Sequence, residues 1–114
     1  MCGIAGIINF KVSSLNSEPI RKMTDSIAHR GPDDSGYFFD NNVAFGFRRL
    51  SILDIKHGNQ PMQTSDGRYV VVYNGEIYNF KELRKQLIQK GFKFKTECDT
   101  EVLLHAFQQW GVDC

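Results

Sequence analysis

The stretch GYFFDNNVAFGFR (36–48) constrains the fold most, because it predicts two adjacent antiparallel strands. Aromatic and β-branched residues are frequent in its two halves, 36–40 and 43–48, and such residues are typical of strands. Asn41 and Asn42 lie between the halves and form, together with Asp40, a short hairpin connection. An antiparallel sheet is therefore the expected framework of the fold.

The rest of the chain is predicted to add strands and helices to this sheet. Strands are expected over residues 3–10, 68–75 and 92–96. Helices are expected from 17 to about 28, from 79 to about 90, and from about 100 to 110. Helices that pack on an antiparallel sheet make an α+β fold.

Local signals predict the helix ends and the helix faces. Ser17 is expected to cap the first helix, and Asn79 with Glu82 resembles a capping box at the second. Gly91 and Gly111 are expected to end the second and third helices. The helical side chains expected to face the core are Ile20, Met23, Ile27, Leu83, Leu87, Ile88, Val102, Leu103, Ala106, Phe107 and Trp110.

Size and composition narrow the class of protein. The chain has 114 residues, enough for one small domain, and its formal net charge is +1. That charge does not favour nucleic acid or an anionic membrane as a partner. No apolar run is long enough to span a bilayer and no secretory signal is evident, so a cytoplasmic location is expected. The three cysteines are widely spaced and include no CxxC pair, so neither a disulfide framework nor a metal site is predicted.

Cys2 is the first candidate for chemistry. Methionine is removed efficiently when the next residue is small, and removal of Met1 would leave Cys2 with both a thiol and a free α-amine. An α-amine has a pKa of about 7.7 to 8.0 and a thiol one of about 8.5, so both titrate near neutral pH. The amine could then take the thiol proton without help from a histidine. The alternative is that Cys2 is a small apolar residue at the start of an ordinary strand.

Four further motifs accompany the N-terminal MCGIAG. They are HRGPDDSG (29–36), RRLSILDI (48–55), YNGEIYNFKELR (73–84) and CDTEVLLHAF (98–107). In this order the five motifs resemble the glutaminase domain of glutamine-hydrolysing asparagine synthetases. That domain is a class II glutamine amidotransferase of the N-terminal-nucleophile hydrolase group, and the resemblance covers essentially the whole chain.

The resemblance implies a catalytic role for three residues. Cys2 matches the nucleophile that attacks the side-chain amide carbon of glutamine and forms a glutamyl thioester. Asn74 and Gly75 match the oxyanion hole, where the Asn side-chain amide and the Gly N–H would donate to the tetrahedral intermediate. Asn-Gly is also a frequent hairpin turn, and the strand is expected to resume at 76–78, so both interpretations stay open.

The resemblance also implies how the substrate is held. Arg49 matches the residue that binds the α-carboxylate of glutamine, for which a planar guanidinium is suited. Glu76 and Asp99 match the acids that bind the α-ammonium group, and Asp99 is also a candidate N-cap of the last helix. Arg48 is interpreted as structural or exposed, and Arg30 is expected to hydrogen-bond near the nucleophile. Cys98 stands where the family more often has Ser or Thr.

The fold implied is the N-terminal-nucleophile hydrolase αββα sandwich, with antiparallel sheets flanked by helices. Residues 2–114 would form the first part of the glutaminase domain, with C-terminal strands and the synthetase domain absent. No cofactor is expected for the glutaminase segment; ATP and magnesium are implied only for the synthetase domain. The implied partners are glutamine, the synthetase domain in the complete protein and, as an open option, a second copy in a homodimer.

The implied activity is hydrolysis of glutamine to glutamate and ammonia, which feeds ATP-dependent amidation of aspartate to asparagine in the complete enzyme. Weak or no activity is expected from the 114 residues alone. One alternative is the glutaminase half of another amidotransferase, such as glucosamine-6-phosphate synthase or amidophosphoribosyltransferase, although the RLSILD and NGEIYN motifs argue against these two. The other alternative is a non-catalytic fragment that serves as an interaction module.

Overall fold

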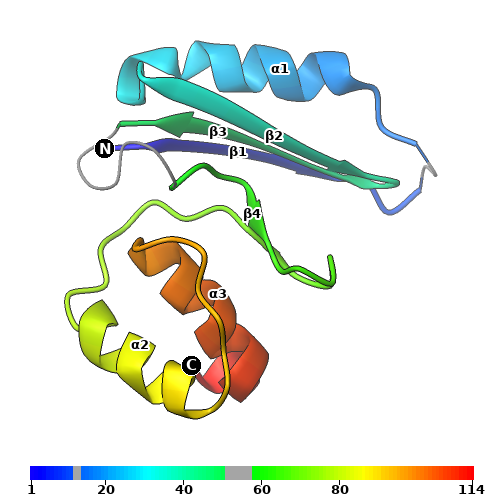
Figure 1. The fold of residues 1–114 in the computed structure, drawn as a ribbon. Coiled ribbons are helices and arrows are strands. Elements are labelled where there is room, and N and C mark those ends of the chain that lie inside the picture. Colours follow the sequence, from blue (N-terminus) through cyan, green and yellow to red (C-terminus); the bar gives the residue numbers. More distant parts are fainter. Residues whose placement is uncertain (12–13, 51–57) are drawn as a thin grey trace. The chain divides into compact units, whose positions relative to one another are not determined.

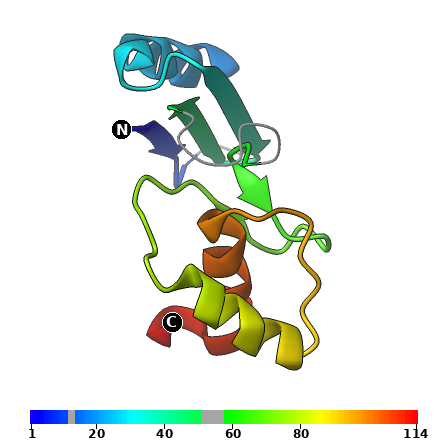
Figure 2. The ribbon, with the colours of Figure 1, turned by 60° about the vertical axis from the view of Figure 1, so that its left-hand side comes forward.

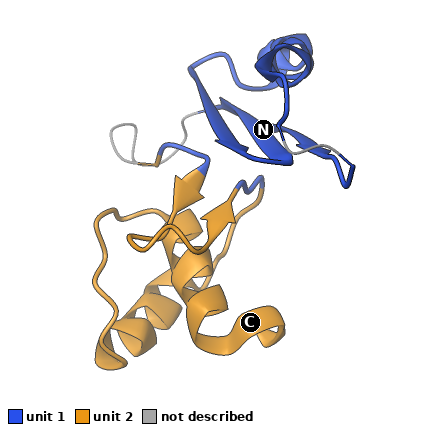
Figure 3. Ribbon diagram, turned by 90° about the vertical axis from the view of Figure 1, so that its right-hand side faces the viewer, with its two compact units in different colours: residues 1–52, 59–61, 72–74 blue, residues 53–58, 62–71, 75–114 orange. Residues whose placement is uncertain are grey.

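The computed structural model describes residues 1–11, 14–50 and 58–114. It has antiparallel sheets and helices, so the α+β class is confirmed. The chain divides into two compact units, which Figure 3 colours separately. Unit 1 comprises residues 1–52, 59–61 and 72–74, and unit 2 comprises residues 53–58, 62–71 and 75–114.

Unit 1 is built on a three-stranded antiparallel sheet in the order β1-β3-β2. The strands are β1 (Gly3–Ile8), β2 (Asp34–Asp40) and β3 (Val43–Arg49). The hairpin of β2 and β3 confirms the prediction for 36–48, and β1 is shorter than the predicted 3–10. The pairing of Gly3 with Arg48 sets the register of β1, so Cys2 lies beside the end of β3.

Helix α1 (Ser17–Ser26) covers one face of this sheet (Figures 1 and 2). Ile20 of the helix, Ala5 of β1 and Ala44 of β3 form the core between them. The cap is Asn16, whose side chain accepts from the Glu18 N–H, so the prediction for Ser17 was wrong by one residue.

Thr24 replaces Met23 as the second core residue of α1. Met23 is 41% exposed, whereas Thr24 is fully buried and its hydroxyl donates to the Ile20 carbonyl at 2.7 Å. Positions 20 and 24 are four residues apart and share one helix face, from which position 23 is turned away. A side chain at Gly46 would overlap the Thr24 hydroxyl, so Gly46 allows the helix to lie close to β3.

Unit 2 contains two short strands and two helices. Strands β4 (Met62–Gln63) and β5 (Val70–Val71) pair antiparallel. Helices α2 (Phe80–Gln89) and α3 (Asp99–Trp110) pack against each other, as Figure 2 shows. Their core consists of Leu87, Val102 and Ala106, surrounded by the partly buried Phe80, Leu83, Phe92, Phe94 and Trp110.

The helices of unit 2 end where predicted, but the capping predicted for α2 is absent. Gly91 and Gly111 have φ of 97° and 64°, which confirms both as helix-ending glycines. Asn79 is the N-cap of α2, but its side chain makes no capping hydrogen bond, so the capping box with Glu82 was wrong. Ile88 is 51% exposed and Phe107 is also exposed, so these two core assignments were wrong as well.

Two strands predicted for residues 68–75 and 92–96 differ from the structure. The first is shortened and the second is absent. The strand expected over 68–75 is reduced to Val70–Val71, because β4 offers it only two residues to pair with. Residues 92–96, all within the described part, form no strand, although Phe92 and Phe94 point inward and Lys93 and Lys95 outward. Their alternating pattern arises from packing on α2 and α3 and not from a sheet.

Candidate active site

Cys2 is held at the end of the unit 1 sheet by backbone groups. Its Sγ lies 3.4 Å from the Leu50 nitrogen and 3.7 Å from the Leu50 oxygen. Nε of Arg30 donates to the Cys2 carbonyl at 3.2 Å, which confirms the prediction that Arg30 hydrogen-bonds near the nucleophile. Cys2 is half-buried. Its thiol contacts the Leu50 backbone, and its carbonyl accepts from Arg30.

The HRGPDDSG motif packs against the end of β3. The Asp33 N–H donates to the Arg49 carbonyl at 3.0 Å, and Pro32 forms a bridge to Arg49. A Cβ at Gly31 would overlap the backbone of Arg48 and Arg49. Glycine is therefore needed at position 31, because it lets the motif backbone lie close to the backbone of Arg48 and Arg49.

Arg48 and Arg49 have opposite surroundings because consecutive side chains point to opposite faces of a strand. Arg48 bonds the Thr24 carbonyl at 3.1 Å and pairs with Asp25 on α1, which confirms its structural role. Arg49 is only 6% exposed, and its Nη1 donates to Oδ1 of Asn59 at 3.0 Å. A buried guanidinium on the strand end next to Cys2 is a suitable anchor for an anion. Residues 51–55 of the same motif lie outside the described residues.

Asn74, Gly75 and Glu76 lie on an exposed segment that leads into α2. Residues 72–79, all within the described part, form no strand, so the expectation that a strand resumes at 76–78 was wrong. Asn-Gly is consequently not the turn of a hairpin. The Tyr73 N–H donates to Oε1 of Gln60 at 2.5 Å and anchors the segment just before Asn74.

Asp99 joins two segments of unit 2. It is the first residue of α3, while Cys98 occupies the N-cap position, so the N-cap prediction for Asp99 was wrong. Its Oδ2 instead accepts from the Ile77 N–H at 3.0 Å. The bond ties the Asp99 carboxylate to the backbone of the residue that immediately follows Glu76.

The whole chain matches a known protein family. Residues 1–114 match the family described as glutamine amidotransferase domain. The chain belongs to this family. Within this glutamine amidotransferase domain, Cys2, Arg49 and Asn74 lie in unit 1, whereas Gly75, Glu76 and Asp99 lie in unit 2.

Three proteins from Bacillus subtilis (strain 168) are similar to this amidotransferase chain. Asparagine synthetase (glutamine-hydrolyzing) 1 is 47% identical over 113 residues, which are 96% of this chain and 18% of that protein. Asparagine synthetases 2 and 3 are 46% and 43% identical, over 98% and 100% of this chain and 15% and 19% of their own lengths. The amidotransferase chain thus spans less than a fifth of each of these relatives.

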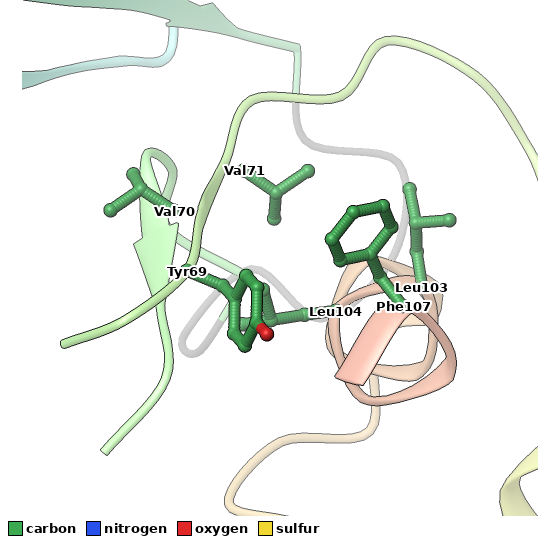
Figure 4. Close-up of a pocket in the computed structure, with 6 residues that line it drawn as sticks. All are labelled: Tyr69, Val70, Val71, Leu103, Leu104 and Phe107. Atoms are coloured by element: carbon green, nitrogen blue, oxygen red, sulfur yellow. The ribbon is translucent and has the colours of Figure 1, made fainter. Parts of the chain in front are cut away.

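Unit 2 of the amidotransferase domain also contains an apolar cavity of about 270 Å³. Figure 4 shows the side chains that line it, which are Tyr69, Val70, Val71, Leu103, Leu104 and Phe107. None of the site residues inferred from the sequence lines this cavity.

Two other features are absent from the part of the chain that the structure describes. Residues 1–11, 14–50 and 58–114 contain no group of three or more His, Cys, Asp or Glu side chains placed to hold a metal ion. Nor does any helix in these ranges have the length and hydropathy needed to cross a membrane.

Sequence reasoning missed Glu101 and Thr96 of the amidotransferase domain. Glu101 is 5% exposed, although an acid in the first turn of a helix is ordinarily on the surface. No periodic signal marked Glu101, because it lies one residue before Val102 and outside the predicted apolar stripe of Val102, Leu103, Ala106, Phe107 and Trp110. Because Glu101 follows Asp99 by two residues, its burial bears on the candidate site.

Proposed function

We propose that this chain carries the glutaminase activity of a glutamine-dependent amidotransferase, with Cys2 as the nucleophile. The observation that carries the proposal is the family match over residues 1–114, which includes a cysteine at position 2 whose thiol sits beside the strand carrying Arg49. Glutamine would be hydrolysed to glutamate and ammonia.

The proposed chemistry begins with removal of Met1, which is exposed. The freed α-amine of Cys2 takes the thiol proton, and the sulfur attacks the side-chain amide carbon of glutamine. The carbon–nitrogen bond then breaks, and the nitrogen leaves as ammonia after receiving that proton. Water finally attacks the glutamyl thioester, which releases glutamate and restores the thiol.

Five further residues would serve this reaction. Arg49 would bind the α-carboxylate of glutamine, while Glu76 and Asp99 would bind its α-ammonium group. Asn74 and Gly75 would donate to the oxyanion of the tetrahedral intermediate, where one lost donor typically costs roughly 2.7–4 kcal/mol of transition-state stabilisation. The burial of Arg49 and the bond from Ile77 to Asp99 support these roles, since both anchors are already fixed.

We further propose that the sheet of unit 1 is one layer of an αββα sandwich, with residues 2–114 as the first part of the domain. The face of the sheet opposite α1 supports this arrangement, because it is also apolar. Ile4 and Ile8 of β1 are exposed there, and they pair with Phe47 and Val43. A second sheet would bury Ile4 and Ile8, whereas Phe47 is already buried.

In the complete protein, the ammonia would reach a synthetase domain that uses ATP and magnesium to convert aspartate to asparagine. The names of the B. subtilis relatives support this pathway, because each is a glutamine-hydrolysing asparagine synthetase. We place the protein in the cytoplasm, where a reducing environment would keep the Cys2 thiol available. Amidation of another carboxylate acceptor is the alternative, and the acceptor would be chosen outside these residues.

The test is a glutaminase assay on the full protein that contains residues 1–114, with its N-terminus determined by mass spectrometry. Replacement Cys2→Ala should lower glutamate release by roughly a thousandfold or more, because no thioester can form. Cys114→Ser is the matched control, because Cys114 is exposed and distant in sequence from every proposed site residue. Normal activity in Cys2→Ala, or in a protein that retains Met1, would refute the mechanism.

A further inference from the structure

Glu101 is a buried carboxylate with an unusually complete set of partners. Its Oε1 accepts from the Lys95 N–H at 2.8 Å, and its Oε2 accepts from the Thr96 N–H at 2.7 Å. The Thr96 hydroxyl also donates to Oε2 at 2.7 Å. Burial of a carboxylate is costly unless such hydrogen bonds satisfy it, so this arrangement has a structural purpose. It fixes the segment that enters α3.

Thr96 extends this arrangement toward Asp99. Its Oγ1 accepts from the Cys98 N–H at 3.3 Å and lies 2.9 Å from the Cys98 Sγ. Cys98 immediately precedes Asp99. One hydroxyl therefore links the buried carboxylate to the turn that orients Asp99.

Arg84 of α2 holds the same segment from the other side. Its Nη1 donates to the Thr96 carbonyl at 2.6 Å, and its Nη2 pairs with Glu97 at 3.1 Å. The guanidinium also lies over the Phe94 ring, 4.2 Å from the ring centroid. Because α2 directly follows the segment with Glu76, Arg84 connects the two segments on which the proposed ammonium-binding acids lie.

His105 closes the buried end of the cluster. Its ring lies between Phe92 and Phe94, with centroids 5.0 and 4.8 Å away, and its Nδ1 is 2.7 Å from Oε1 of Gln108. Its Nε2 lies 3.7 Å from Oε1 of Glu101. His105 thus packs on two aromatic side chains within one helical turn of Glu101, whose carboxylate bonds the 95–96 backbone.

We propose that Glu101 and Thr96 are positioning residues that hold Asp99, and through Ile77 also Glu76, in the geometry that binds the α-ammonium group of glutamine. The inference rests on the proposed function of those two acids. Glu101 and Thr96 do not touch the substrate, since they act through the backbone of the segment that precedes Asp99. Their loss loosens recognition of the ammonium group and leaves the chemistry at Cys2 intact.

The first test compares two substrates in the full protein with Met1 removed. One substrate is glutamine, and the other is glutaramate, which keeps the carboxylate and the amide but lacks the α-amino group. In Thr96→Val the KM for glutamine should rise by roughly three- to tenfold, the change that corresponds to loss of one buried hydrogen bond. The kcat for glutamine and the turnover of glutaramate should stay unchanged.

Thr96→Ser is the matched control, because it keeps the hydroxyl and should restore the glutamine KM. Glu101→Gln should act in the same direction as Thr96→Val, since an amide cannot accept from both the 95 and 96 N–H groups and the Thr96 hydroxyl. An unchanged glutamine KM in Thr96→Val overturns the inference. An equal loss with both substrates also overturns it, since that result reports general misfolding.

The second test needs no catalysis and separates this inference from the proposed function. Hydrogen exchange at the Ile77 amide, which bonds Asp99, should become faster in Thr96→Val, while the buried helical amides of Leu87 and Ala106 stay protected. Faster exchange at Ile77 in a protein without glutaminase activity would support the positioning network and refute the proposed function. Unchanged exchange would refute the network whatever the activity.

Discussion

The two units hold their proposed site residues by different means. In unit 1, Cys2 and Arg49 are fixed by strand register and by close contact of backbones, at Gly31 above all. In unit 2, Asp99 and the segment after Glu76 are held by hydrogen bonds of polar side chains, among them Thr96. These residues lie in loops and at a helix end, and not in paired strands. The Cys2 thiol is thus placed by the sheet itself, whereas the acids proposed to bind the ammonium group depend on individual hydrogen bonds.

The largest expected effect tests the backbone contacts of unit 1. A Cβ at Gly36 would overlap the carbonyl oxygen of Gln60, and backbone cannot move aside as a flexible side chain can. Gly36→Ala should therefore lower the free energy of unfolding of unit 1 by about 3 kcal/mol. Urea unfolding combined with hydrogen exchange of the β1 and β3 amides would measure it.

Gly6→Ala is the matched control for that substitution. Gly6 also lies in a strand, but its Cβ would come no closer than 3.4 Å to the Phe45 ring, an ordinary contact. It should leave the exchange of the sheet amides nearly unchanged. Equal destabilisation by both substitutions would show that the contact with Gln60 is not what holds the sheet edge.

The next effect tests the core that supports the polar network of unit 2. Leu87 is fully buried between α2 and α3, and Leu87→Ala should cost about 2 kcal/mol through lost burial and a cavity. Ile88→Ala is its control, because half of that side chain is exposed. Fluorescence of Trp110, which packs on the same core, would follow the unfolding. A similar cost for both would contradict the assignment of the helix faces.

A smaller effect concerns the two neighbouring arginines of β3. Arg49→Lys should raise the glutamine KM by roughly tenfold, because an ammonium group replaces the planar fork proposed to bind the carboxylate. Arg48→Lys should leave the KM unchanged, since Arg48 bonds Thr24 and Asp25 on α1. Steady-state kinetics on the two variants would decide, and a larger KM change in Arg48→Lys would reverse the assignment.

The smallest expected effect is a pH dependence in the β4–β5 turn. The Thr64 hydroxyl, and then the Arg68 N–H, bond the Asp66 carboxylate and lower its pKa below the ordinary value. Because the folded pKa lies below the unfolded one, the stabilisation is present above the unfolded value of about 4 and is lost as the pH falls through the folded pKa. Asp66→Asn should therefore be slightly less stable than the parent at pH 7, and this difference should shrink as the pH falls below about 4. A difference that does not shrink with falling pH would assign it to another cause.

Elements with strong local signals could be predicted from the sequence, whereas those that depend on a partner could not. The hairpin of β2 and β3 has its own turn, and α3 has a glycine at its end, so both were found. Residues 68–75 and 92–96 have high strand propensity, but a strand also needs a neighbour, which local composition does not reveal. Helix faces show the same limit. Met23 and Ile88 are exposed although they were assigned to the core, whereas the adjacent Thr24 and Leu87 are buried.

The candidate site shows the same division. Arg30 and Arg48 were predicted correctly, since Arg30 belongs to the HRGPDDSG motif and Arg48 is not the position that matches the family's substrate-binding arginine. Glu101 was missed because its role depends on hydrogen bonds from Thr96, five residues earlier in the chain. These bonds form because the loop with Thr96 lies against the first turn of α3. Hydrogen bonds between a helical side chain and the loop before the helix leave no periodic pattern in a sequence.

The antiparallel pairing of β1 with β3 has a practical consequence for labelling. Gly3 pairs with Arg48 at one end of β1, and Ile8 pairs with Val43 at the other. The exposed turn residue Asn41 is therefore separated from Cys2 by the length of the strand, about 20 Å. A dye or an affinity tag inserted at this turn would provide a fixed handle for tethering the protein to a surface while the thiol stays free to react.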